Sequence, residues 1–270
     1  MKKLYSIDAE NAQLHISKGN SKIGKGIWAI SFLPGNKDHM VYIGKNVLLT
    51  DIPGTCSKYC DGCAKDGACY AWRDLKLHHN VTVKAWAENT ILLRSGQLFE
   101  KLDEFITQKN KDYYVSKGVK DRKIITFRIN VSGEVESLAQ FEAWNNLALH
   151  HPEVNFGIYT KNFDDLDKFM KKNGKIADNF IINISEWHGV AKEFLTKYPN
   201  QFNVFEYDDT NRKDCDLDNV EKERLSKTVH CPAVTKTGHH AKTKDGRDVT
   251  CDMCRRCYTK GHTYTAVYSH

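Results

Sequence analysis

From residue 123 onward the chain alternates short runs of β-branched and aromatic residues with stretches whose apolar residues recur every three or four positions. The first pattern predicts buried strands, and the second predicts helices with one buried face. We expect strands at 124–131, 154–159, 180–184 and 202–207, with helical stripes at 138–147, 163–170 and 191–198. Strands and helices that alternate every 25–30 residues or so are typical of βαβ units around a parallel sheet, either open or barrel-like.

The N-terminal third has weaker patterns. Short strands are predicted at 27–32 and 47–50, and helical spacing runs from 71 to 110 with a break expected at Gly96. After about residue 225 the chain becomes rich in Lys, Thr, Gly, His and Cys and poor in aliphatic residues. Such a segment buries too little apolar area to order itself without a metal. We therefore expect an α/β unit over 1–224 and a metal-organised tail over 225–270 that docks on it.

Charge and hydropathy limit the functional classes. The net charge is +6, and the segment between Cys231 and His262 carries +4 of it, with seven basic and three acidic residues. This tail could contact nucleic acid. No run approaches the roughly 20 apolar residues of a membrane span, and the first residues lack the apolar core of a secretory signal. We expect a cytoplasmic protein without membrane contact.

Eight of the nine cysteines fall into two sets, which in a reducing compartment favours metal sites over disulfides. The N-terminal set is Cys56, Cys60, Cys63 and Cys69, and the tail set is Cys231, Cys251, Cys254 and Cys257. Cys215 stands apart, and we interpret it as a structural or incidental thiol.

The tail set favours a [4Fe–4S] cluster. Three cysteines separated by two residues each can hold three corners of a cubane, with a remote cysteine such as Cys231 as the fourth ligand. Zinc remains the alternative, although structural zinc usually takes two separated cysteine or histidine pairs.

Polar residues follow every strand of the predicted array. The carboxyl ends of parallel strands meet along one edge, so these residues predict an active-site crevice there; for any one of them, capping of the next helix is the alternative. The four groups are Ser132-Gly133-Glu134, Thr160-Lys161-Asn162, Ser185-Glu186-Trp187-His188 and Asp208-Asp209-Thr210.

The spacing Cys56-x3-Cys60-x2-Cys63 resembles that of radical S-adenosylmethionine enzymes, and Ser132-Gly133-Glu134 resembles their Gly-Gly-Glu motif. The resemblance implies a partial TIM-like (β/α) barrel and a [4Fe–4S] cluster whose fourth iron binds S-adenosylmethionine. The cofactor would lie against Asn130, Ser132, Gly133 and Glu134, with Glu134 at its amine, and Lys161, Glu186 and His188 would face the substrate. The chain departs from that pattern at Gly62, where an aromatic residue is usual, at Ser132, and at Cys69, which could supply a fourth thiolate.

The whole chain also resembles the phage family named after gene product 88. The shared features are the cysteine motif that ends in Cys69-Tyr70-Ala71, the segment 130–134, Tyr159-Thr160-Lys161-Asn162, and His230-Cys231-Pro232-Ala233 with the closing cysteine triple. This resemblance implies a phage-encoded protein in a bacterial host, with no established reaction.

Three functions remain open. The first is a radical S-adenosylmethionine enzyme with two [4Fe–4S] clusters, which would need an electron donor such as flavodoxin or ferredoxin. The second is an electron-transfer or redox-sensing protein in which Cys69 closes the first cluster. The third is a zinc-stabilised module that binds nucleic acid through the basic tail, with Tyr258, His262, Tyr264 and Tyr268 stacking on bases.

Overall fold

The structure is a computed structural model of an α/β protein. It describes residues 4–5, 7–20, 23–35, 49–50, 52–60, 69, 71, 74–75, 79–115, 123–187, 189–210, 213, 215–237, 239–261 and 263–268. In that part of the chain, no helix is both long and apolar enough to cross a bilayer.

The main elements in chain order are β1 (Leu4–Tyr5), β2 (Ser17–Lys18), β3 (Trp28–Ala29), β4 (Leu49–Thr50), η1 (Lys58–Cys60), α3 (His79–Ser95), α4 (Gln97–Val115), β5 (Thr126–Ile129), α5 (Leu138–His150), β6 (Asn155–Thr160), α6 (Phe163–Asn173), β7 (Phe180–Glu186), α7 (Lys192–Lys197), β8 (Asn203–Asp208), α8 (Asn219–Lys227), α9 (Cys251–Cys254), η2 (Arg256–Tyr258) and β9 (Tyr264–Tyr268).

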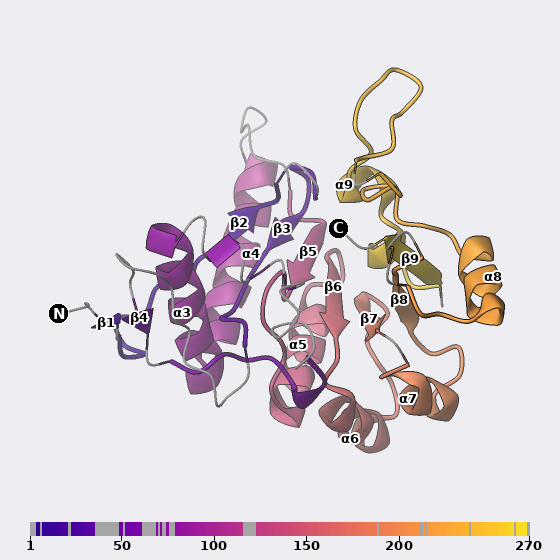
Figure 1. The fold of residues 1–270 in the computed structure, drawn as a ribbon. Helices are drawn as coiled ribbons and strands as arrows, with labels where there is room; N and C mark the ends of the chain where they lie inside the picture. The colour runs from indigo at the N-terminus through magenta and orange to yellow at the C-terminus, as the bar shows by residue number, and fades with distance from the viewer. Residues whose placement is uncertain are drawn as a thin grey trace.

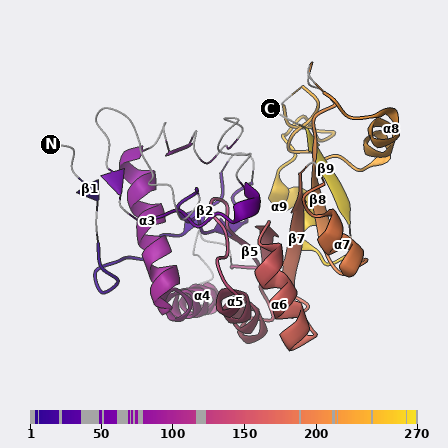
Figure 2. The same cartoon turned by 60° about the horizontal axis from the view of Figure 1, so that its bottom comes forward.

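Seven strands form one sheet in the order β2-β3-β5-β6-β7-β8-β9 (Figure 1). Every pair is parallel except β2 and β3. Among the described strands, β2 and β9 are the outer members and do not pair with each other, so the sheet is open. Helices α4 to α7 follow one another along one side of it (Figure 2).

The predicted α/β class and the four central strands are confirmed, with β5 to β8 matching the expected runs to within a few residues. The predicted break at Gly96 is also confirmed, since α3 ends at Ser95 and α4 begins at Gln97. Two features differ from expectation. Residues 49–50 pair with β1 in a separate two-stranded sheet, and the tail supplies β9, a strand that its polar composition did not predict.

Alternation along the strands explains how the sheet is covered. Phe127, Phe156, Ile158 and Ile182 belong to the same buried cluster as residues of the helices, which include Phe141, Trp144, Leu166 and Phe169. Side chains of a strand alternate between its two faces, so the intervening residues lie on the face without helices. Buried parallel sheets need cover on both faces, and here the second cover is the tail.

The 3-10 turn η2 lies on that second face. A Cβ atom on Gly157 of β6 would come within 2.4 Å of Cδ1 of Tyr258, so only glycine allows the ring this close. Asn183 of β7 donates to the carbonyl of Cys257 at 2.9 Å, and Asn203 of β8 donates to that of Thr259 at 3.0 Å. These contacts fix the last cysteine of the tail against the middle of the sheet.

The tail also reaches the segment before β3. Ile23, Ile27 and Tyr258 form a small buried cluster. The Asp252 carboxylate accepts from the backbone of Gly26 at 3.0 Å, and the Asp252 N–H donates to the carbonyl of Ile23 at 2.9 Å. The tail, with α9 and η2, therefore spans the face opposite α4 to α7, from β9 back to the segment before β3.

The close contact at Gly157 predicts a position-specific loss of stability. In Gly157→Ala the added methyl group would collide with the Tyr258 ring, and we expect the free energy of unfolding to fall by roughly 1–3 kcal/mol. Gly261→Ala is the matched control, because its Cβ would meet only a methyl carbon of Thr263 at 3.5 Å. Urea unfolding of both variants tests this, and equal losses would contradict the proposed contact.

Candidate functional site

The start of the N-terminal cysteine set is held firmly by the backbone. Thr55 donates to the carbonyl of Leu33 from its N–H and its hydroxyl, at 2.9 and 3.0 Å. Cys56 donates to the carbonyl of Gly35 at 2.8 Å, and the Gly35 N–H donates to the Cys56 sulfur at 3.3 Å. Cys60 ends η1. Cys56, Cys60 and Cys69 are half-buried thiols, whereas Cys63 lies outside the described residues.

The segment Asn130-Val131-Ser132-Gly133-Glu134, here called the β5 loop, follows the carboxyl end of β5 and contacts Thr55. Glu134 donates its N–H to the Thr55 hydroxyl at 2.8 Å. Gly133 has a φ of 80°, and a Cβ there would lie 2.5 Å from the same oxygen. Both the conformation and the close approach therefore require glycine. Through Thr55, Cys56 therefore lies next to the predicted cofactor-binding segment Ser132-Gly133-Glu134.

Two polar atoms of the β5 loop are buried with no hydrogen-bond partner among the described residues, the Oδ1 atom of Asn130 and the Oγ atom of Ser132. Asn130 also has a φ of 56°, in the left-handed region. Buried polar atoms without partners are rare and cost free energy, so they favour a ligand group at that place. They match the predicted cofactor-binding residues.

Glu134 lies at the centre of this arrangement and is 6% exposed. Its carboxylate accepts from the N–H of Lys161 at 2.7 Å and from that of Val135 at 2.9 Å, and Asn130 donates to it at 3.3 Å. Burial raises the pKa of Glu134 to about 7, against the opposing effect of these hydrogen bonds. The group can therefore exchange a proton near neutral pH.

Further side chains of the candidate site come from the carboxyl ends of β6, β7 and β8. Ser57 donates to the carbonyl of Lys161 at 3.1 Å, so the cysteine segment also contacts the β6 end. The Lys161 ammonium lies 5.5 Å from the ring centre of Trp187, and Trp187 stacks on Tyr207 with centroids 4.0 Å apart. These side chains form a cationic and aromatic group, and the backbone of Lys161 contacts Ser57, the residue after Cys56.

Not every predicted strand-end residue joins this surface. The Glu186 carboxylate accepts from the N–H groups of Gly189 and Ala191, at 2.5 and 2.9 Å, and so closes the turn before α7. Burial raises its pKa. His188 lies outside the described residues. The structure therefore brings Glu134 and Lys161 together, whereas the Glu186 carboxylate binds backbone N–H groups of the turn that follows β7.

The thiols of the tail set affect one another's ionisation. Burial, followed by the nearby thiols of Cys231, Cys251 and Cys254, raises the pKa of Cys257 to about 12, although a hydrogen bond from Tyr159 lowers it. The charge of the other three tail thiols therefore reaches the Cys257 thiol. Bound iron or zinc stabilises the thiolate form of its ligands and reverses this effect.

Both cysteine sets meet at the β5 loop. Val131 packs against the cluster of Ile23, Ile27 and Tyr258, and so does Cys251 of the tail set. Two residues further on, Gly133 and Glu134 contact Thr55 beside Cys56. One five-residue segment thus separates the two cysteine sets.

Two contributors were missed from the sequence, Thr55 and Ser57, because a hydroxyl beside a cysteine carries no signal of what it contacts. The predicted stacking aromatics require a correction. Tyr258 is 2% exposed and packs against the sheet, so it cannot stack on bases. Tyr268 stacks on His230 at 4.2 Å, Tyr264 is 47% exposed, and His262 lies outside the described residues.

Fold and site together define an α/β protein with an open, mostly parallel sheet, in which the β5 loop contacts Thr55 beside Cys56 and packs with the same apolar cluster as Cys251. The family model described as Gene product 88 matches residues 14–260, and the chain belongs to this phage family, as predicted. No curated protein and no solved structure matched the chain.

The raised pKa of Glu134 predicts a pH dependence of stability. The carboxyl titrates near 4.5 when unfolded and near 7 when folded, so its protonated form favours the folded state. The stability present below pH 4.5 should be lost as the pH rises towards 7. We expect Glu134→Gln to flatten the decline in the free energy of unfolding between pH 5 and 7 by up to about 1.4 kcal/mol per pH unit.

Glu142→Gln serves as the control for that experiment. The hydrogen bond from Lys172 lowers the pKa of the half-buried Glu142 carboxyl, so this group changes the free energy of unfolding only at pH values below about 4.5. Urea unfolding across the pH range should therefore show a changed slope between pH 5 and 7 in Glu134→Gln alone. Identical slopes in both variants and the wild type would refute a carboxyl that titrates near 7.

Proposed function

We propose that this protein binds two [4Fe–4S] clusters and uses the first to activate S-adenosylmethionine. Cys56, Cys60 and Cys63 would hold the first cluster, and the tail set would hold the second. The observation that carries the proposal is the contact between Thr55 and the β5 loop, which puts Cys56 beside the buried Glu134 at the carboxyl edge of a parallel sheet. Ligands of parallel α/β folds bind at that edge.

The strand order supports a partial barrel of the radical S-adenosylmethionine type. From β3 to β8 each strand pairs in parallel with the next main-sheet strand along the chain, and α4 to α7 lie on one side (Figure 2). Such an arrangement curves around the face opposite the helices. In this protein that face carries Gly157 and the tail cysteines, where a barrel would enclose its cofactors.

The chain's own groups suit the cofactor's amino-acid end. The free Oδ1 atom of Asn130 and Oγ atom of Ser132 can accept from an ammonium group, and Glu134 can pair with it once ionised. Lys161 and the stacked Trp187–Tyr207 pair would border the substrate side. When bound, the cluster supplies an electron that cleaves the sulfonium of S-adenosylmethionine and starts radical chemistry.

The tail set would hold a cluster that relays electrons or anchors substrate. Three described basic residues of this segment pair with acidic ones, since Lys242 contacts Asp248, Arg247 contacts Asp245 and Lys260 contacts Asp178. Asp245 and Asp248 are already subtracted in the net charge of +4, so the segment keeps a basic excess that would favour an anionic cluster.

Metal analysis of cysteine variants tests the proposal. Anaerobically purified wild-type protein should contain about eight irons and eight sulfides per chain. Cys56→Ser and Cys257→Ser should each lose about half of the iron, because each removes a ligand of a different cluster. Cys215→Ser is the matched control and should keep all of it. Zinc without iron in the wild type would overturn the proposal.

The same measurement on Cys69→Ser separates the enzyme from a closed-cluster redox protein. If three cysteines hold the first cluster, this variant should retain about eight irons. Loss of the first cluster would instead show that Cys69 is its fourth ligand, which leaves no iron for S-adenosylmethionine.

A further inference from the structure

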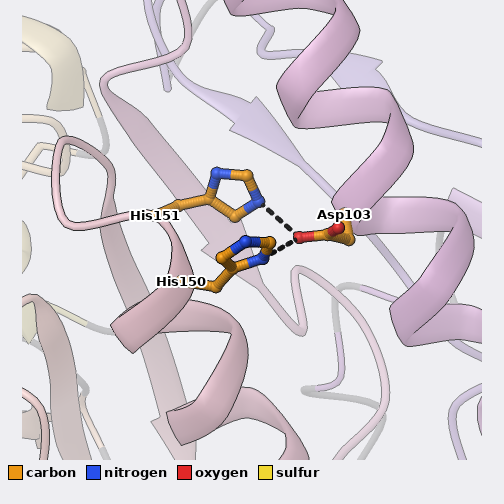
Figure 3. A group of neighbouring side chains, drawn as sticks. All are labelled: Asp103, His150 and His151. Carbon is orange, nitrogen blue, oxygen red and sulfur yellow. Dashed lines mark hydrogen bonds and ion pairs between the residues drawn. The ribbon is translucent and has the colours of Figure 1, made fainter.

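Two histidines and an aspartate converge at the edge of the sheet opposite the β5 loop (Figure 3). The Oδ1 atom of Asp103 lies 2.5 Å from Nδ1 of His150 and 2.8 Å from Nε2 of His151. All three donor atoms lie within 4.8 Å of one another. None of them takes part in the site described above.

The scaffold around these residues is rigid. Asp103 comes from α4, His150 is the last residue of α5, and His151 caps that helix by donating its N–H to the carbonyl of Leu147 at 3.1 Å. Asn179 donates to the His151 carbonyl at 3.0 Å. The His151 side chain is 6% exposed and that of His150 is 66% exposed, so the group is buried on one side and open to water on the other.

A second layer orients the buried histidine. The Nδ1 atom of His151 lies 3.7 Å from Oε1 of Glu153, and Asn110 donates to that same oxygen at 3.0 Å. Asn110 is itself held by the N–H of Ile124 at 2.9 Å. The Glu153 carboxylate thus lies near the ring nitrogen at which metal-binding histidines usually have a hydrogen-bond partner, at a distance longer than a hydrogen bond.

The Nε2 atom of His151 lies 2.8 Å from Oδ1 of Asp103, within hydrogen-bond distance. Without a metal, a ring N–H can donate to this carboxylate oxygen, and a divalent metal ion would take the place of that proton. The second ring, from His150, faces the same oxygen and adds another nitrogen donor.

We propose that Asp103, His150 and His151 bind one divalent transition-metal ion. Two imidazoles and a carboxylate form a donor set that suits zinc, which in open sites has three protein ligands and a water. The exposed side at His150 would admit that water. The ion would fasten α4 to the turn between α5 and β6. The site is independent of the proposed clusters.

Zinc titration of the anaerobic, iron-loaded protein tests this site by calorimetry, with the histidine ring nitrogens followed by 15N NMR. The wild type should bind zinc with shifts at the rings of His150 and His151. His150→Gln and Asp103→Asn should each lose one zinc equivalent, and His150 is exposed enough that its substitution spares the fold. Glu153→Gln should weaken binding by roughly 10–100-fold.

His15→Gln is the matched control. His15 lies 2.6 Å from the Glu88 carboxylate but belongs to no three-donor group among the described residues, so its loss should leave the zinc equivalent intact. Zinc uptake that is equal in the wild type, His150→Gln and Asp103→Asn would overturn the proposal, because the metal would then be bound elsewhere, for instance by free thiols.

Discussion

The packing of Tyr258 over Gly157 is the contact on which the arrangement of the cysteines depends. Among the described elements, the helices α4 to α7 cover one face of the sheet, and a parallel sheet is stable when both faces are covered. The missing side chain at Gly157 lets the tail turn approach the other face, where Asn183 and Asn203 bind its carbonyl groups. Cys257 thereby comes to lie against β7, and Cys251 packs against the cluster of Ile23, Ile27 and Tyr258.

That placement gives the two cysteine sets a common neighbour. The β5 loop packs through Val131 against the apolar cluster that includes Tyr258 of the tail, and contacts Thr55 beside Cys56 through Gly133 and Glu134. The β5 loop therefore links the surroundings of both cysteine sets. Because the tail is polar, the free energy of metal binding would also be free energy of folding for this part of the chain. We therefore expect the tail to lose stability when its metal is removed.

The fold was predictable where a pattern of neighbouring residues in the sequence determines the element. The strands β5 to β8 and the break at Gly96 follow from apolar spacing alone. The strand β9 was missed because its partner β8 is remote in sequence and its Tyr and Thr residues resemble a polar tail. For the same reason Tyr258 looked exposed, since only the glycine at 157 makes room for its ring. The cysteine sets were visible from spacing, whereas the group around Asp103 joins residues 47 and 48 positions apart.

The most direct test of the central claim is electron paramagnetic resonance of the reduced, iron-loaded protein before and after S-adenosylmethionine is added. If the first cluster has an iron without a cysteine ligand beside Glu134, the cofactor should change the signal of one cluster and leave the other unaltered. A spectrum of two clusters that the cofactor does not change would contradict an open iron and assign the protein to electron transfer or redox sensing.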